Sequence, residues 1–242
     1  MLSDPVIDRL IDRLIDRMPS SCRICRSWGA SALCGACLQR FSAPRPRCQR
    51  CGLPLPRMDG AAASCGSCTR QPPLWQRAVC AHDYAFPWSD LVADFKFQAD
   101  VALARLLAQQ LAIALRQTPQ ALDVDLVLPV PLSAARLQER GFNQSWELAR
   151  RLGQTFGLAC DADLLQRPVD TAHQVDLSLQ ERDRNLRGAF MVTPGQHQKV
   201  AGRRVALVDD VMTTGATLRE ATRSLLAAGA ASVDVWTVAR TP

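Results

Sequence analysis

One continuous segment, residues 205–218 (VALVDDVMTTGATL), constrains the fold of this 242-residue chain more than any other. Its apolar start predicts a buried strand. Two carboxylates, Asp209 and Asp210, end that strand, and a Thr/Gly-rich turn then leads into an amphipathic helix at about 216–228. Such a turn gathers backbone N–H groups at a helix N-terminus, where the dipole favours an anion. Carboxylates repel a bare phosphate, so the segment predicts a ligand that also carries hydroxyls or a metal, such as a ribose phosphate.

This segment resembles the phosphoribosyl pyrophosphate (PRPP) motif of type I phosphoribosyltransferases, in which an apolar strand, two acidic residues and a TTGAT-like loop follow one another. By that resemblance, Asp209 and Asp210 would hold the ribose hydroxyls and are the candidate catalytic residues, and the loop would bind the 5′-phosphate. The predicted PRPP-binding residues of the segment are Asp209, Asp210, Val211, Met212, Thr213, Thr214, Gly215, Ala216 and Thr217. The Walker pattern G-x-x-x-x-G-K-[ST] is absent, which disfavours nucleotide hydrolysis.

Eight cysteines form four Cys-x-x-Cys pairs, a spacing that lets two thiolates reach one tetrahedral Zn²⁺. Two pairs complete a four-cysteine site, so we predict two structural zinc ions. Sequential pairing is the simpler arrangement, and an interleaved pairing stays open. A disulfide framework would need an oxidising compartment, and no signal peptide is recognisable, so we expect zinc and a cytoplasmic location. The predicted ligands are Cys22, Cys25, Cys34, Cys37, Cys48, Cys51, Cys65 and Cys68.

The charge of the chain is concentrated in the cysteine-rich part. The formal net charge is +6, but each four-cysteine zinc site would contribute about −2. Residues 20–77 contain nine arginines and one acidic residue, Asp59. A basic zinc ribbon can bind a phosphate backbone, so contact with single-stranded DNA is one expectation and a solvated arginine-rich surface is the alternative. No apolar run reaches the roughly 18 residues of a membrane span.

The first 19 residues contain an Ile-Asp-Arg-Leu repeat whose apolar positions form one helical stripe. We predict an amphipathic helix that ends at Pro19 and packs on its own chain or on a second copy; the DNA-uptake machinery or a membrane surface are alternative partners. The predicted domains are this helix (1–19), a double zinc-ribbon module (20–75) and a phosphoribosyltransferase-like domain (76–242).

The middle of the chain narrows the family. The motif order is similar to that of the ComF family of competence-associated phosphoribosyltransferase-like proteins, and it comprises residues 95–97 (FKF), 128–132 (LPVPL), Arg136, 140–145 (RGFNQS), 174–178, 182–185 and 188–190. The resemblance implies a pyrophosphate loop at 129–136 and a hood over the site at 171–187. It adds Lys96, Pro129, Val130, Pro131, Arg136, Arg140 and Arg182 to the predicted PRPP-binding residues, with Mg²⁺ accompanying PRPP. Four alternatives stay open: an exposed helix lysine for Lys96, a structural ion pair for Arg140, an N-cap role for Asn143 and a solvated helix for Arg182.

Strands alternating with helices predict an α/β fold with a parallel sheet and ligands at the carboxyl ends of its strands. The resemblance implies that this fold is of the type I phosphoribosyltransferase type, with helices on both faces of the sheet. We expect strands at about 77–82, 125–130, 205–213 and 233–238, and helices at about 89–97, 101–117, 144–156, 178–185 and 216–228.

The function expected from these features is PRPP binding in a protein of the competence and natural-transformation type, coupled to the handling of single-stranded DNA. Two alternatives stay open. One is an active phosphoribosyltransferase that releases pyrophosphate as it transfers the phosphoribosyl group to an acceptor. The other is a regulator that senses PRPP without turnover.

Overall fold

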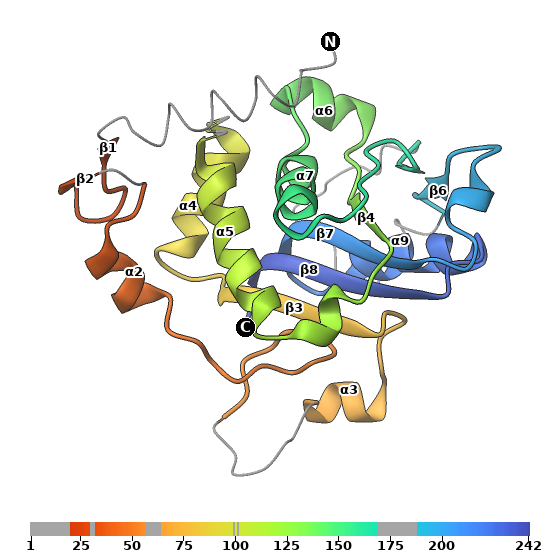
Figure 1. Ribbon diagram of the computed structural model, residues 1–242, viewed down its shortest axis with the longest axis horizontal. Coiled ribbons are helices and arrows are strands. Elements are labelled where there is room, and N and C mark those ends of the chain that lie inside the picture. The colour runs from red at the N-terminus through yellow and green to blue at the C-terminus, as the bar shows by residue number, and fades with distance from the viewer. Residues whose placement is uncertain (1–19, 30–31, 57–63, 99, 101, 169–187) are drawn as a thin grey trace, which may run out of the picture. The chain divides into compact units, whose positions relative to one another are not determined.

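A computed structural model of the protein describes residues 20–29, 32–56, 64–98, 100, 102–168 and 188–242 (Figure 1). The predicted helices at 1–19 and 178–185 lie outside these residues. Contacts divide the chain into two compact units, Met1–Pro44 and Arg45–Pro242. The predicted division at 19/20 and 75/76 remains a prediction; the contact-based units instead separate the first two cysteine pairs from the last two.

The described part of the first unit is a small ribbon. Strands β1 (Ser20–Ser21) and β2 (Trp28–Gly29) pair antiparallel around the first Cys-x-x-Cys turn. The second turn opens helix α2 (Gly35–Phe41), with Cys34 as the extended residue before it. The second unit repeats this plan. An antiparallel bridge joins Arg47 and Pro54 around the third Cys-x-x-Cys turn, and Cys65 of the fourth turn precedes a short helix.

A four-stranded sheet forms the centre of the second unit, in the order β3-β8-β7-β4. All neighbouring strands are parallel, as predicted. The strands are β3 (Arg77–Asp83), β4 (Leu126–Pro129), β7 (Arg204–Met212) and β8 (Ser232–Arg240). A further antiparallel pair, β5 (Leu165–Gln166) and β6 (Met191–Val192), stands apart from this sheet.

Helices cover both faces of the sheet, which confirms the predicted fold class (Figure 1). Helices α5 and α7 contact one another and the sheet, whereas α9 contacts β6, β7 and β8. The helices of this unit are α3 (Gly66–Arg70), α4 (Trp88–Phe97), α5 (Ala102–Arg116), α6 (Ala134–Arg140), α7 (Gln144–Phe156) and α9 (Ala216–Ala227), with 3-10 helices η1 (Pro119–Leu122) and η2 (His197–Lys199).

The alternation of β7 explains how one strand supports two layers. Val205 and Leu207 belong to the apolar cluster that includes Leu218 and Leu225 of α9. The alternate residues, Ala206 and Val208, are equally buried and face the other layer, since successive side chains of a strand point to opposite faces. A strand buried on both faces reads as a continuous apolar run, which is why residues 205–208 could be predicted as a strand.

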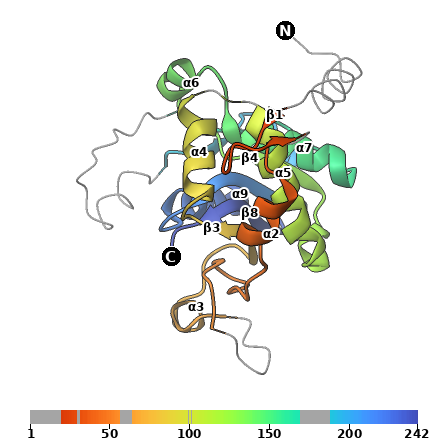
Figure 2. The same ribbon diagram turned by 90° about the vertical axis from the view of Figure 1, so that its left-hand side faces the viewer.

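The last two cysteine pairs lie at one edge of the sheet. Figures 1 and 2 both show α3 beneath β3, which is an edge strand of the sheet. This placement brings the cysteine-rich turn of residues 48–51 against β3 through a hydrogen bond from the Ala78 N–H to the Gln49 carbonyl oxygen, 2.8 Å long. The second four-cysteine group is therefore part of the sheet domain's own packing.

Candidate functional site

The predicted phosphate loop joins the end of β7 to the start of α9. Gly215 has φ +76° and precedes the helix, a left-handed conformation that glycine adopts without steric cost. Thr213 and Thr214 are exposed, and the Thr214 hydroxyl oxygen accepts a hydrogen bond from the Ala216 N–H at 3.3 Å. The loop thus presents hydroxyls beside the N–H groups of a helix first turn, the arrangement that binds a phosphate.

The acidic pair lies in β7, separated from Thr213 by Val211 and Met212, and is held by two neighbouring side chains and by its own backbone. Asp210 is 3% exposed, and its Oδ1 lies 2.8 Å from Lys96 Nζ of α4. Asp209 is partly exposed, and its Oδ1 accepts hydrogen bonds from the Ser145 hydroxyl at 3.0 Å and from the Asp210 N–H at 2.9 Å. These contacts fix both carboxylates at the carboxyl end of the central strand.

One buried carboxylate oxygen of the acidic pair has no hydrogen-bond donor among the described residues. Asp210 Oδ2 is buried and has no hydrogen-bond partner among the residues that the structure describes. A buried acceptor without a donor costs about 1–3 kcal/mol, so this oxygen suits a ligand that brings a hydroxyl donor or a divalent cation. Carboxylate oxygens are also ligands that Mg²⁺ prefers.

The electrostatics of the pair favour one proton. Burial raises the pKa of Asp209, and the neighbouring charge of Asp210 raises it further, to about 7. The Lys96 ammonium and the Ser145 hydroxyl act in the opposite direction. Two carboxylates this close resist simultaneous ionisation, and a ligand that donates hydrogen bonds to both would relieve that repulsion.

The predicted pyrophosphate loop lies beside the acidic pair. Pro129 pairs with Val208 in the sheet, and the Val130 N–H donates to the Val208 carbonyl oxygen at 2.9 Å. Asn143 Nδ2 donates to the Val130 carbonyl oxygen at 3.2 Å, while its Oδ1 accepts from the N–H groups of Ser145 and Trp146. The N-cap role expected of Asn143 is therefore confirmed, and its amide also ties helix α7 to this loop.

The remaining predicted cations differ in their placement. Lys96 lies at the acidic pair. Arg136 is half-buried in α6. Arg140, at the end of the same helix, places its guanidinium carbon 5.3 Å from the centre of the Phe97 ring, a cation–π contact. Arg182 and the predicted hood at 171–187 lie outside the described residues.

Ser145 is a site residue that the sequence did not identify. It is 1% exposed, and its hydroxyl contacts the acidic pair from the first turn of α7. Residues 140–145 carried part of the family resemblance, and Asn143 accounted for the local helix start. No pattern in the sequence indicates that Ser145, two residues after this cap, reaches a carboxylate on strand β7.

Both groups of cysteines have the geometry of a four-thiolate metal site. The four Sγ atoms of each group lie within 4.8 Å of one another, and the groups are Cys22/Cys25/Cys34/Cys37 and Cys48/Cys51/Cys65/Cys68. The sequential pairing is therefore the one that the structure shows, and the interleaved alternative is excluded. Four thiolates bound tetrahedrally at about 2.3 Å from Zn²⁺ would be about 3.8 Å apart. The Cys25–Cys34 and Cys51–Cys65 Sγ distances of 3.6 Å and 3.7 Å fit that value.

The surroundings of the two groups repeat as well. The Cys34 N–H donates to Cys22 Sγ at 3.5 Å, and the Cys65 N–H donates to Cys48 Sγ at 3.2 Å.

Burial raises the pKa of the thiols, but backbone N–H donors outweigh it at Cys22, and a backbone donor and neighbouring thiols outweigh it at Cys65, which lowers their pKa values to about 6 and about 7. Burial dominates at Cys68, whose pKa it raises to about 11, and it also raises the pKa of Cys37 and Cys51. The backbone donors orient the sulfurs, and a bound cation would hold all four thiols of a group as thiolates.

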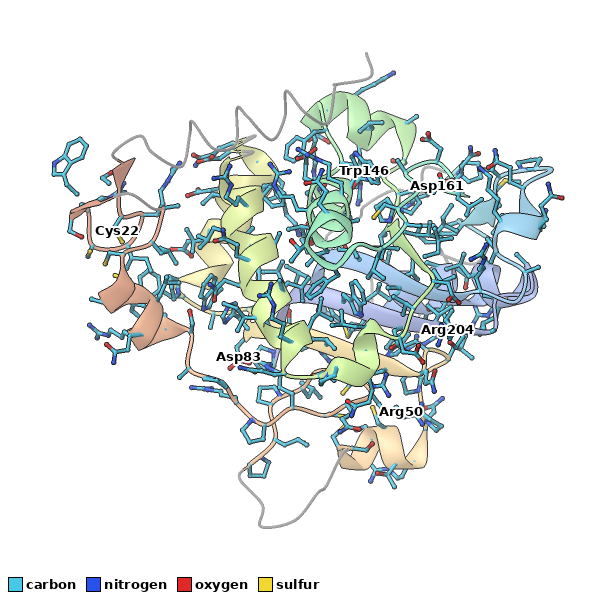
Figure 3. The ribbon with its side chains drawn as sticks, viewed as in Figure 1. Cys22, Arg50, Asp83, Trp146, Asp161 and Arg204 are labelled. Atoms are coloured by element: carbon cyan, nitrogen blue, oxygen red, sulfur yellow. The ribbon has the colours of Figure 1, made fainter. Side chains whose placement is uncertain are left out.

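The basic surface is smaller than the sequence suggests. Arg47 Nη2 lies 2.7 Å from Asp83 Oδ1, and Arg45 Nη1 lies 3.0 Å from Asp83 Oδ2, so both arginines pair with a carboxylate. Figure 3 labels Asp83, which lies at the end of β3, and it also labels Cys22 of the first unit. The first unit retains exposed arginines at 23, 26 and 40, together with Trp28, which is 80% exposed. Within the described part of the chain, the helices are too short or too polar to serve as membrane spans.

A match to a described protein family agrees with this geometry. The parallel sheet, the acidic pair and the loop before α9 define a phosphoribosyltransferase-type domain, and residues 138–242 match the family described as "Phosphoribosyl transferase domain". A purine phosphoribosyltransferase from Pyrococcus horikoshii is similar over 57% of this chain and 84% of its own, with 18% identity and a TM-score of 0.35.

Relatives with both parts of the chain identify the family. The chain is 40% identical over 235 residues to "DNA utilization protein YhgH" of Salmonella typhimurium, covering 93% of this chain and 98% of the relative. It is 34% identical over 213 residues to "Competence protein F" of Haemophilus influenzae, covering 87% and 91%. The chain belongs to the ComF family of competence and DNA-utilization proteins, as the motif order predicted.

Proposed function

We propose that this protein binds PRPP together with Mg²⁺ at the end of β7. The observation that carries the proposal is the buried Asp210 Oδ2, which lacks a partner among the described residues and belongs to the strand that leads into the predicted phosphate loop. The ribose hydroxyls would supply the missing donors to Asp209 and Asp210, and residues 213–217 would receive the 5′-phosphate. Bound Mg²⁺ would neutralise the pyrophosphate, whose charge would otherwise be repelled by the two carboxylates.

Calorimetric titration of the zinc-loaded protein with PRPP and Mg²⁺ tests this proposal. We expect saturable binding by the wild type and its loss in an Asp209→Asn/Asp210→Asn variant, because the amides no longer accept from the hydroxyls as carboxylates do. Asp163→Asn, which removes an exposed carboxylate elsewhere, is the matched control and should bind normally. A folded, zinc-replete wild type that does not bind PRPP would overturn the proposal.

Binding and turnover are separable in this site. Displacement of pyrophosphate at ribose C1 needs position and charge neutralisation more than covalent help from the protein. Acceptor-dependent release of pyrophosphate would identify a transferase. PRPP binding that changes affinity for DNA or a protein, without pyrophosphate release, would identify a regulator.

We also propose that the first four-cysteine unit binds single-stranded DNA. Its exposed arginines supply phosphate contacts, and Trp28, 80% exposed on β2, supplies a ring on which a base can stack. This combination of cations and an unburied aromatic ring is typical of proteins that bind single strands. We place this action in the cytoplasm, where cysteines are kept reduced and can bind metal as thiolates.

Fluorescence anisotropy with a labelled oligonucleotide tests the DNA proposal. A lost base stack costs about 1–3 kcal/mol, so Trp28→Ala should weaken binding by roughly 5- to 150-fold, whereas Trp28→Phe should retain most of it. Binding should also fall steeply with salt. Equal affinity of the wild type and Trp28→Ala would show that this tryptophan does not contact DNA.

A further inference from the structure

Three successive carbonyl groups of the cysteine-rich turn at residues 48–51 accept hydrogen bonds from the sheet domain. The Gln49 oxygen accepts from the Ala78 N–H of β3 at 2.8 Å. The Arg50 oxygen accepts from Trp75 Nε1 at 2.5 Å, and Figure 3 labels Arg50 near the lower edge of the domain. The Cys51 oxygen accepts from Arg240 Nε at 3.0 Å. The backbone between two metal-ligating thiols is thus attached at every residue.

Trp75 connects this turn to the phosphate loop through its ring. The residue is 2% exposed. A methyl group added at Gly215 would lie only 3.0 Å from Trp75 Cη2, so the far edge of the indole packs against the loop glycine that begins α9. One rigid side chain therefore contacts the metal-site backbone at its nitrogen and the phosphate loop at its opposite edge.

Arg240 makes a second connection. Besides its bond to Cys51, its Nη1 donates to the Met212 carbonyl oxygen at 3.2 Å. The Thr241 N–H donates to the same oxygen at 3.0 Å. Met212 is the last residue of β7 and directly precedes the phosphate loop. Both ends of that loop are consequently held by side chains that also hold the cysteine-rich turn.

We infer that Trp75 and Arg240 are positioning residues through which metal at Cys48/Cys51/Cys65/Cys68 and PRPP at the phosphate loop strengthen each other's binding. A metal held by Cys48 and Cys51 fixes the carbonyls between them. Loss of the metal frees that turn and leaves the buried indole N–H without its acceptor, which is costly. The inference rests on the proposed PRPP site, and by linkage the effect is reciprocal.

A further contact shows how closely the turn fits the domain. Gly52 has φ +69°, and a methyl group added there would lie 2.1 Å from Cys80 Sγ of β3. Cys80 is itself 4% exposed and accepts a hydrogen bond from the Thr237 hydroxyl at 2.9 Å. The turn consequently has no room to move toward the sheet, so a change in its conformation is passed to Trp75 and Arg240.

The experiment measures zinc release to a chelating dye with and without saturating PRPP and Mg²⁺. We expect PRPP to slow release of one of two zinc ions by about tenfold, within the usual range of linked sites. A Cys22→Ser/Cys25→Ser variant, which lacks the first site, should keep the protected ion. The first group belongs to the other compact unit and serves as an internal control whose release PRPP leaves unchanged.

Variants separate coupling from general stabilisation. Trp75→Phe removes the N–H donor and shortens the ring, so protection should disappear; Arg240→Gln is the second test if that variant does not fold. Trp236→Phe is the matched control, because Trp236 is fully buried and its Nε1 has no partner among the described residues. Asp209→Asn/Asp210→Asn should abolish protection by removing PRPP binding.

The outcomes distinguish this inference from the proposed function. Calorimetric PRPP binding with unchanged zinc release would overturn the coupling and leave the PRPP site standing. Equal slowing of both zinc ions, or protection that persists in Trp75→Phe and Arg240→Gln, would also overturn it. Absence of PRPP binding by the folded wild type would remove the proposed function and the coupling together.

Discussion

Lys96 and Asp210 form an ion pair between helix α4 and strand β7, with Nζ 2.8 Å from Oδ1 and the two side chains 18% and 4% exposed. The lysine therefore compensates a carboxylate that is otherwise removed from water. The lysine also lies where PRPP is proposed to bind. The pair therefore contributes both to the stability of the folded protein and to the electrostatic attraction of the site for PRPP. Stability and ligand binding should respond differently when it is broken.

Lys96→Met should lower the free energy of unfolding by about 3 kcal/mol, because it leaves a buried carboxylate without its cation. Urea denaturation measures this change. Lys199→Met is the matched control in a chain with two lysines: its side chain is 55% exposed and its Nζ lies 3.5 Å from Asp161 Oδ2, so its loss should stay within about 0.5 kcal/mol. Similar losses in both variants would contradict the expected role of the buried pair.

The double variant Lys96→Met/Asp210→Asn should be more stable than the sum of its single changes predicts. Residues in direct contact are coupled, and removing both charges avoids the unpaired one. A double-mutant cycle from urea denaturation gives the coupling free energy. Strict additivity would mean that the two groups do not interact in solution.

The acidic pair makes stability and ligand binding depend on pH in opposite directions. Burial and the charge of Asp210 raise the pKa of Asp209 to about 7. The folded state thus keeps a proton that the unfolded chain loses above about pH 4, so the stability from this group is present below that pH and lost as pH rises through about 7. A ribose diol donates to the ionised form, so PRPP binding should release protons and strengthen between about pH 6 and pH 8.

Ser145→Ala tests this assignment, because the Ser145 hydroxyl lowers the pKa of Asp209. Without it, the pH at which PRPP affinity reaches half its maximum should rise relative to the wild type. Titration calorimetry in buffers of different ionisation enthalpy counts the protons released. The phosphates of PRPP titrate in the same way with the wild type and with Ser145→Ala, so their contribution cancels when the two midpoints are compared. An unchanged midpoint would mean that Asp209 does not control the pH dependence.

The two four-cysteine groups should differ in their effect on the sheet domain. Metal analysis should find two zinc ions per chain in the wild type and one in either Cys22→Ser/Cys25→Ser or Cys48→Ser/Cys51→Ser. Only the second variant should lower the melting temperature of the sheet domain, because only that turn bonds to β3, Trp75 and Arg240. Equal destabilisation by both variants would contradict this expectation.

The sequence predicted most of the sheet domain because its signals were local and strong. Residues 205–208 form an apolar run, and the strand found there, β7, is buried on both faces. Helix α7 begins and ends as predicted, since Asn143 caps it and Gly157 takes a left-handed conformation after it. Helix α6 was missed because it has seven residues and buries none of them, so it has no apolar period to recognise.

The candidate site could be predicted where its residues lie in a motif of the sequence. Asp209 and the phosphate loop are contiguous in sequence and Lys96 lies in a segment that matches the family, but Ser145 and Trp75 reach the site from other elements without such a signal. Long-range contacts of this kind leave no periodicity or spacing in a single chain. The same limit applies to the cysteine-rich turn, whose metal site was predicted from spacing and whose attachment to the sheet was not.

A comparison of two glycines measures the packing of Trp75 against the phosphate loop. Gly215 and Gly195 have nearly equal φ, +76° and +78°, so alanine incurs a similar left-handed strain of about 1–2 kcal/mol at each. A methyl group at Gly195 meets no atom within 4 Å, whereas one at Gly215 lies 3.0 Å from Trp75 Cη2. Gly215→Ala should therefore destabilise the protein more than Gly195→Ala in urea denaturation.

The extra cost at Gly215 should depend on the indole. Phenylalanine at position 75 lacks the outer ring that carries Cη2, so Trp75→Phe/Gly215→Ala should be less destabilised than the sum of the single variants, whereas Trp75→Phe/Gly195→Ala should be additive. PRPP affinity should fall in Gly215→Ala and stay unchanged in Gly195→Ala, because only the former displaces the loop that begins α9. Additivity in both pairs would mean that the indole does not restrain the loop, and the link between the cysteine-rich turn and the phosphate site would then rest on Arg240 alone.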